Sequence, residues 1–127
     1  MQQLSFRAGE GRHRVELTAS LTGDGLVVTI AGGERPHIGA VCVGLPRPSM
    51  DDPARLSCNV AVLPVVGHKD DEIARPVAEN LARHTGQVSV VAAGLHVDAA
   101  SDRDIALLIA NAWQVVDKLL EALGKKG

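Results

Sequence analysis

Three short segments of the chain combine glycine with histidine, and each lies where a predicted strand ends or a helix is about to begin. They cover residues 32–39 (Gly-Gly-Glu-Arg-Pro-His-Ile-Gly), 67–71 (Gly-His-Lys-Asp-Asp) and 94–98 (Gly-Leu-His-Val-Asp). Glycine lets the backbone approach a ligand closely, and exposed backbone N–H groups can hold an anion. A phosphate or a carboxylate is therefore the ligand that these segments suit.

Side chains in the same segments can supply positive charge and hydrogen-bond donors to such an anion. They are Arg35, His37, His68, Lys69 and His96. Segment 67–71 also precedes a predicted helix, whose N-terminal dipole favours an anion. A plainer interpretation stays open for each feature, because paired glycines make tight turns, single histidines are commonly structural, and Asp70 and Asp71 suit a helix cap. The presence of three such segments in one short chain favours a ligand site.

Known catalytic motifs give no support for a reaction. The glycine segments fit neither G-x-x-x-x-G-K-[ST] nor G-x-G-x-x-G, and the chain lacks H-E-x-x-H and G-x-S-x-G. The three histidines with Cys42 and Cys58 could assemble a zinc site, but their spacings do not favour one. A Cys/His nucleophilic pair or a disulfide between the two cysteines also stays open. However, a thiol within an apolar strand is usually inert, and reduced cysteines are the default in the cytoplasm.

Composition indicates one globular domain over residues 1–127. Hydrophobic residues make up 46% of the 127 residues and charged residues 22%, which argues against disorder. A net charge of -2 argues against a basic surface for nucleic acid, and the only aromatic residues, Phe6 and Trp113, argue against a base-stacking platform. No segment approaches the ~18 apolar residues that span a membrane. We expect a cytoplasmic protein with neither a nucleic-acid nor a membrane partner.

The first half of the chain is predicted to be β. Alternating polar and apolar residues, separated by turn chemistry at 22–25, predict a hairpin. The predicted strands cover residues 4–8, 14–20, 26–30, 38–43 and 59–65. Segment 44–57 is predicted to be a long surface loop, because its prolines lack the N–H that strand pairing uses.

The second half is predicted to be helix, strand and helix. Ile73, Val77 and Leu81 recur every four residues and predict a helix that ends at Gly86, with Pro76 as a kink. A short strand over 87–92 follows. The last helix begins after Ser101, in a capping box with Asp104, and carries a wide apolar stripe over 105–123.

This element order predicts an α+β fold, with two helices packed on one face of a largely antiparallel sheet. Such a sheet leaves an open face or edge, so we expect a homodimer.

The glycine–histidine segments together resemble the LpdD-like prenylated-flavin chaperones, the small subunits encoded beside UbiD-type decarboxylases such as gallate decarboxylase. The resemblance rests on Gly-Gly-x-x-Pro-His-Ile-Gly at 32–39, the His68 segment before a helix, Arg75 within that helix, and Gly-Leu-His-Val at 94–97. It covers about residues 12–123. The proline-rich region within 44–67 departs most from the pattern.

The resemblance implies a protein that is not an enzyme. Such proteins hold reduced prenylated FMN, made by the flavin prenyltransferase, and deliver it to an apo UbiD-like decarboxylase; FMN itself is a second candidate ligand. The implied fold is similar to that of proteasome-assembly chaperones, a small α+β domain that dimerises. The residues expected at the cofactor are Gly33, Arg35, Pro36, His37, Gly39, His68, Lys69, Arg75 and His96. Of these, Arg35, Lys69 and Arg75 are candidates for a phosphate clamp, beside an apolar slot for the flavin.

Two other functions stay open. The chain could be a structural accessory subunit of a decarboxylase complex that binds no cofactor and makes contact through the helix stripe and the proline-rich segment. It could also be a small hydrolytic enzyme that pairs a histidine with Asp98 or Asp102. Clustering of His37, His68 and His96 around a cleft would favour the ligand site, and scattering of these residues over the surface would favour structural roles.

Overall fold

The computed structural model describes residues 1–65 and 70–124. Six strands form one sheet in the order β1-β2-β3-β6-β4-β5. The strands are β1 (Gln2–Ala8), β2 (Val15–Leu21), β3 (Gly25–Gly33), β4 (Ala40–Pro48), β5 (Leu56–Pro64) and β6 (Val88–His96). All neighbouring strands are antiparallel except β3 and β6, which are parallel.

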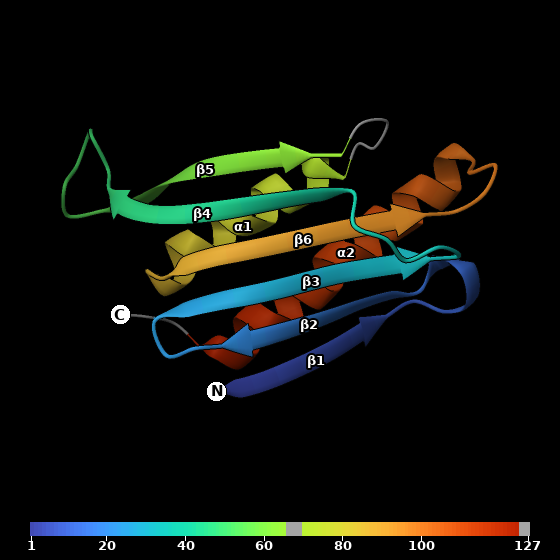
Figure 1. The fold of residues 1–127 in the computed structure, drawn as a ribbon, viewed down its shortest axis with the longest axis horizontal. Coiled ribbons are helices and arrows are strands. Elements are labelled where there is room, and N and C mark those ends of the chain that lie inside the picture. Colours follow the sequence, from blue (N-terminus) through green and yellow to red (C-terminus); the bar gives the residue numbers. More distant parts are fainter. Residues whose placement is uncertain (66–69, 125–127) are drawn as a thin grey trace.

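Two helices cover one face of this sheet (Figure 1). Helix α1 (Asp71–Thr85) packs against β4, β5 and β6, and helix α2 (Asp102–Leu123) packs mainly against β1 and β2. A single 3₁₀ turn, η1 (Gly11–His13), connects β1 to β2. The prediction of an α+β fold with a largely antiparallel sheet and two helices on one face is confirmed. In the described part of the chain, no helix is long and apolar enough to cross a membrane.

The core lies between the sheet and the helices, and it follows the two expected periodicities. Leu17 and Ile30 reach it from the sheet, and Leu81 and Leu119 from the helices, all with no exposed surface. Helix α1 ends at Gly86 in the left-handed conformation, as its sequence predicts. The capping box predicted at the start of α2 is present. The local signals in the sequence therefore placed both helices correctly.

The prediction that residues 44–57 form a long loop is wrong. Strand β4 continues to Pro48 and β5 begins at Leu56, so only residues 49–55 connect them. The Ser49 amide donates to the Arg55 carbonyl, so the N–H of Ser49 points to the β5 side. Successive residues of a strand direct their backbone nitrogens to opposite sides, and the nitrogens of Pro46 and Pro48 therefore point away from β5. On that other side, β6 pairs with β4 only as far as Gly44. The missing proline N–H groups therefore leave no strand hydrogen bond unmade.

Strand β6 lies at the centre of the sheet and positions the candidate site. It runs to His96, four residues beyond the predicted strand over 87–92. Because β6 is parallel to β3, the two strands end side by side, and Gly33 is paired with His96. The first and third glycine–histidine segments therefore meet at one edge of the sheet.

Candidate functional site

His37 and His96 lie together at the end of β6. After β3, residues 34–39 follow the end of β6, because the Glu34 amide donates to the His96 carbonyl and the Gly39 amide to the Ala93 carbonyl. The two imidazole rings are in an edge-to-face arrangement, with centroids 6.2 Å apart. Two of the three histidines expected at a common site are thus brought together, and the third, His68, lies outside the described residues.

Asp70 joins this pair from the start of α1. Its side chain is 10% exposed, and Oδ2 lies 3.0 Å from Nε2 of His37. Its other oxygen, Oδ1, accepts a hydrogen bond of 3.0 Å from the Leu95 amide in β6. The sequence predicts Asp70 as a helix cap, but its side chain makes no cap hydrogen bond. Asp70 thus occupies the N-cap position of α1, as the sequence predicts, but its carboxylate contacts tertiary partners that no local pattern reveals.

Three glycines make this close packing possible. A Cβ atom at Gly33 would overlap the His96 carbonyl, one at Gly39 would overlap the Asp70 carboxylate, and one at Gly94 would overlap the His37 carbonyl. Gly33 also has a φ of 81°, which side chains rarely adopt. The glycines of two sequence segments therefore leave space for His37, His96 and Asp70, which together form the histidine cluster.

Both ring nitrogens of His37 lie beside oxygen atoms. Nδ1 is 3.0 Å from the Arg35 carbonyl and Nε2 is 3.0 Å from Asp70. These two contacts orient the His37 ring between the segment after β3 and the start of α1, beside His96.

His96 contacts a second carboxylate. Its Nε2 lies 2.9 Å from Oδ1 of Asp98, and the same oxygen accepts a bond of 2.6 Å from Arg35. Hydrogen bonds from His96 and then from Arg35 hold the pKa of Asp98 below its usual value. Arg35 thus lies beside the cluster, as expected for a residue of the phosphate clamp. Its guanidinium, however, is hydrogen-bonded to the Asp98 carboxylate.

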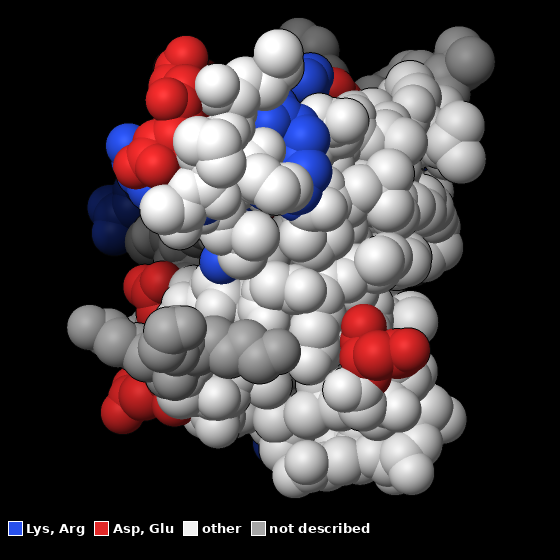
Figure 2. All heavy atoms as spheres, turned by 90° about the vertical axis from the view of Figure 1, so that its left-hand side faces the viewer, with Lys and Arg blue, Asp and Glu red and all other residues white. Residues whose placement is uncertain are grey.

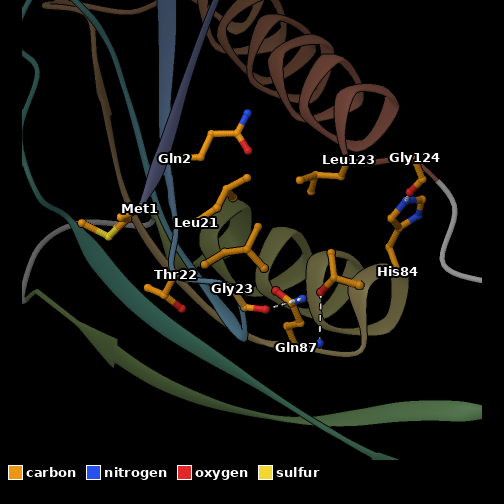
Figure 3. A pocket seen from close by; sticks show the side chains of 11 residues that line it. Met1, Gln2, Leu21, Thr22, Gly23, His84, Gln87, Leu123 and Gly124 are labelled. Carbon is orange, nitrogen blue, oxygen red and sulfur yellow. Dashed lines mark hydrogen bonds between the residues drawn. The ribbon is translucent and has the colours of Figure 1, made fainter.

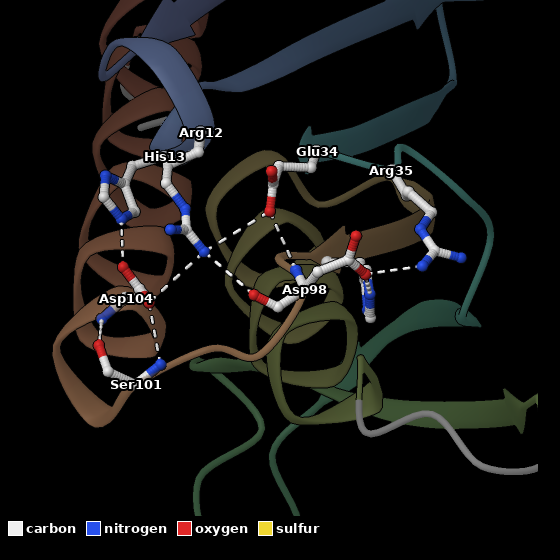
Figure 4. A network of polar contacts seen from close by, with 8 residues as sticks. Arg12, His13, Glu34, Arg35, Asp98, Ser101 and Asp104 are labelled. Atoms are coloured by element: carbon white, nitrogen blue, oxygen red, sulfur yellow. Dashed lines mark hydrogen bonds and ion pairs between the residues drawn. The ribbon is translucent and has the colours of Figure 1, made fainter.

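A wider polar network supports this end of the molecule (Figure 4). Arg12 donates to the Asp98 carbonyl at 3.1 Å and lies 3.5 Å from Glu34, whose carboxylate accepts from the Asp98 amide. His13 is 2.7 Å from Asp104 in the first turn of α2, and this bond is the main cause of the lowered pKa of Asp104. The network joins η1, the segment after β3 and the start of α2.

A cavity of about 530 Å³ opens next to the cluster, between the starts of α1 and α2 and the end of β6. Its lining residues are Asp70, Glu72, Ile73, Leu95, His96, Val97, Ala100, Ile105, Leu108 and Ile109. The volume lies within the ~300–1,000 Å³ of typical small-molecule sites, which are likewise mostly apolar with a few polar groups.

Two apolar residues of α2 are partly exposed and form part of the wall of this cavity. The exposed fraction is 46% for Ile105 and 38% for Ile109, although both belong to the apolar stripe of α2. Their spacing is that of ordinary core residues, so no local pattern in the sequence marks them as part of a ligand site. Their partial exposure beside His96 is the signal that distinguishes them.

The remaining predicted site residues are more dispersed. Pro36 lines a separate hollow of about 290 Å³ together with Gly33. Arg75 is exposed on α1 and acts electrostatically on Cys42 in β4; it is not among the residues that line the 530 Å³ cavity. Lys69 lies outside the described residues. Of the three candidates for a phosphate clamp, the described part of the chain therefore places only Arg35 beside the histidines.

Comparison with known proteins identifies the family. The pattern of the prenylated flavin chaperone LpdD-like domain matches residues 9–124. The chain belongs to this family. The matched region contains every residue of the histidine cluster and its cavity, so the resemblance noted from the glycine–histidine segments is confirmed. No curated protein matches this LpdD-like chain.

The fold of the LpdD-like chain is similar to that of a subunit in the crystal structure of a chaperone complex for yeast 20S proteasome assembly. The TM-score is 0.55 at 13% sequence identity, and the alignment covers 92% of this chain and 98% of the other. At this identity the likeness establishes the architecture alone. It confirms the expected fold class.

A second cavity of the LpdD-like chain, of about 410 Å³, lies near the C-terminal ends of both helices (Figure 3). Leu21 and Leu123 contribute apolar surface, while His84 and Gln87 contribute polar groups. It contains none of the predicted site residues, and the turn between β2 and β3 forms part of its wall. It is therefore separate from the histidine cluster.

The two cysteines of the LpdD-like chain are free thiols. Burial is the main cause that raises the pKa of both Cys42 and Cys58, so neither forms a thiolate readily. Among residues 1–65 and 70–124, no three side chains of His, Cys, Asp or Glu are grouped as metal ligands. One candidate ligand of the zinc site that the residue spacings did not favour, His68, lies outside these ranges.

Proposed function

We propose that this LpdD-like protein is a carrier that binds reduced prenylated FMN, or FMN, and delivers it to an apo UbiD-like decarboxylase without transforming it. The observation that carries the proposal is the cavity of about 530 Å³ whose apolar walls meet the His37–Asp70–His96 cluster. The family description names a prenylated flavin, which has an apolar prenyl group and a ring with polar edges. The cavity offers a matching surface to each.

The charges around the cavity suggest how the cofactor is oriented. Asp70 and Glu72 are the acidic residues of the lining, and a phosphate placed against them would be repelled. The ring and prenyl group therefore occupy the apolar part, between Ile73 and Ile109, and the phosphate points outward. Arg35 beside His96 is then available to the phosphate if it exchanges Asp98 for the ligand.

The lining also suits release. Phe6 and Trp113, the aromatic residues of the chain, are not among the residues that line the cavity, so aliphatic side chains hold the ring. A carrier needs moderate affinity, and a micromolar dissociation constant corresponds to about -8 kcal/mol. The exposed Ile105 and Ile109 leave one side of the bound cofactor within reach of an acceptor. The flavin prenyltransferase is the proposed donor and the decarboxylase the proposed acceptor.

Anaerobic binding of reduced prenylated FMN tests the proposal. We expect co-elution in gel filtration, slower oxidation of the bound cofactor, and activation of an apo UbiD-like decarboxylase by the loaded carrier. Ile109→Asp should weaken binding at least tenfold, because it places a charge in the apolar wall. Gln114→Asp, at an exposed position further along α2, is the matched control and should bind normally.

The absence of both co-elution and protection would contradict the cofactor role. The accessory-subunit function makes a different prediction, in which the chain binds the decarboxylase without flavin. In that case, His37→Ala would leave complex formation unchanged.

A further inference from the structure

The Asp98 carboxylate lies against two hydrogen-bond donors beside the 530 Å³ cavity. Its Oδ1 atom is 2.6 Å from the Arg35 guanidinium and 2.9 Å from Nε2 of His96. His96 lines the cavity, and Arg35 is the clamp candidate next to it. Carboxylates and phosphates are both anions that pair well with a guanidinium. Asp98 therefore occupies the donors that the phosphate of a ligand in the cavity would use.

The backbone of Asp98 is held in place, whereas its side chain can turn towards solvent. The Asp98 amide donates to Glu34 at 3.0 Å, and its carbonyl accepts from Arg12 at 3.1 Å. Figure 4 shows Arg12 and Arg35 reaching Asp98 from opposite sides. The side chain is 56% exposed, so moving the carboxylate away from Arg35 places it in water and buries no charge. Exchange of Asp98 for a ligand therefore needs only a side-chain rotation.

Asp70, the carboxylate of the histidine cluster, differs from Asp98 in this respect. Its side chain is only 10% exposed and is held by both His37 and the Leu95 amide. Displacing it would leave partly buried donors without an acceptor, which is costly. Of the two carboxylates beside the histidine rings, Asp70 thus supports the cluster and Asp98 is the exchangeable one.

The charges around Asp98 limit how strongly an anion can bind at this place. Two guanidinium groups, those of Arg12 and Arg35, meet three carboxylates, those of Glu34, Asp98 and Asp104. While Asp98 is charged and paired with Arg35, an incoming phosphate meets more negative than positive side chains. Neutralising Asp98 would leave two cations facing two carboxylates and would release Arg35.

Paired charges occur at the other end of the molecule as well. Figure 2 shows the end that bears residues 49–55, where acidic and basic side chains also lie side by side. On α1, for example, Glu79 forms an ion pair of 2.7 Å with Arg83 one helical turn further on. The Asp98 pair is distinguished from such surface pairs because its second partner, His96, belongs to the wall of a cavity.

We propose that Asp98 is an internal competitor of the ligand's phosphate and thereby determines the affinity and the phosphate preference of the cavity. A phosphate can reach Arg35 and His96 only in molecules from which the Asp98 carboxylate has turned away, and the apparent affinity falls by that fraction. A flavin without a phosphate does not use these donors, so Asp98 does not affect its binding. The inference rests on the proposed carrier function and adds the residue that keeps the affinity low enough for release.

Asp98→Asn tests the competition, because it keeps the shape of the side chain and an acceptor oxygen but removes the charge. Titrations of FMN and of riboflavin, followed by flavin fluorescence, compare a ligand that has the phosphate with one that lacks it. We expect Asp98→Asn to lower the dissociation constant of FMN about fivefold, the effect of an exposed ion pair, and to leave that of riboflavin unchanged. Glu79→Gln removes the same charge from an ion pair on α1 and should change neither constant. Circular dichroism checks that both variants fold.

A double-mutant cycle with Arg35→Gln identifies the group for which Asp98 and the phosphate compete. Arg35→Gln alone should reduce the preference for FMN over riboflavin, since it removes the guanidinium. In this background Asp98→Asn should lose most of its effect, because the competitor and the ligand share Arg35. An undiminished effect of Asp98→Asn without Arg35 would overturn the proposal.

Two further outcomes would also overturn it. Equal tightening of FMN and riboflavin, or weaker binding of FMN to Asp98→Asn, would mean that Asp98 shapes the cavity and does not compete with phosphate. Phosphorus NMR with inorganic phosphate keeps the test independent of flavin, and Asp98→Asn should bind phosphate more tightly than the wild type. If the wild type binds no flavin, the carrier function fails; if both proteins bind phosphate equally, the competition fails. The two failures are therefore distinguishable.

Discussion

The backbone of His37 lies directly over Gly94, so closely that a Cβ atom at position 94 would overlap the His37 carbonyl. This contact joins the segment after β3 to the end of β6, which are adjacent only because β6 is inserted beside β3. It holds His37 at the distance from which its ring meets both His96 and Asp70. Gly94 thus helps to assemble the site, because it leaves room for the backbone of His37.

Gly94→Ala should therefore disturb the site and the stability of the fold. Because the overlapping atoms are backbone, the segment around His37 must shift, and we expect a loss of about 1–3 kcal/mol in the free energy of unfolding. Urea denaturation measures the loss, and flavin binding should weaken with it. Gly25→Ala is the control and should cost less, since a Cβ there would lie 3.2 Å from the Val88 carbonyl, which is a tight contact but not an overlap. Equal effects of the two substitutions would contradict the role of Gly94.

Asp70→Ala should destabilise the protein more than loss of an ordinary surface carboxylate. It leaves the Leu95 amide and His37 without their shared acceptor in a site where the Asp70 side chain is only 10% exposed. We expect a loss of about 1–3 kcal/mol in the free energy of unfolding. Asp102→Ala, at an exposed position in the first turn of α2, is the matched control and should cost well under 1 kcal/mol. Comparable losses in the two variants would show that Asp70 is not a structural centre.

Local signals in the sequence sufficed for much of the fold. The spacing of Ile73, Val77 and Leu81 reports burial against the sheet, and the Ser101–Asp104 capping box needs residues only three apart. These patterns depend on interactions within one helical turn or along one strand. The predictions made from them therefore do not depend on the order of strands in the sheet.

The errors arose where the outcome depends on sheet order. Pro46 and Pro48 fit in β4 because β6 does not extend beside them, and no local pattern states that. Asp70 has the sequence of a helix cap, but its partners His37 and Leu95 are distant in the chain. The glycine–histidine segments were recognisable as a set, whereas the apolar half of the site was not. Its residues on α2 have the spacing of a core stripe and are distinguished only by exposure.

The His13–Asp104 bond should make stability depend on pH in the acid range. The folded state lowers the pKa of Asp104, chiefly through the hydrogen bond from His13, so around pH 2–4 the folded state binds fewer protons than the unfolded chain. Stability from this group is present above the unfolded pKa and is lost as the pH falls towards the folded pKa. Asp104→Asn should flatten the fall in stability on acidification.

Urea denaturation at a series of pH values between 5 and 2 measures this effect. Asp102→Asn, in the same helical turn, is the control and should keep the wild-type slope. If Asp104→Asn retains the full acid dependence, the His13–Asp104 pair is not a source of it. His84→Ala offers a second control, because His84 donates to the Gly124 carbonyl at the other end of α2.

The two thiols should react slowly in the native protein. Burial raises the pKa of Cys42, which has no exposed surface, and of Cys58, whose Sγ lies 3.8 Å from the Glu79 carbonyl. Less thiolate is then present at pH 8, and access is restricted. With a thiol-reactive chromogenic disulfide, Cys58 should react more slowly than free cysteine, and Cys42 only when the chain unfolds. A Cys58→Ser variant isolates Cys42, and its rapid labelling without denaturant would reopen the Cys/His nucleophile that the buried position argues against.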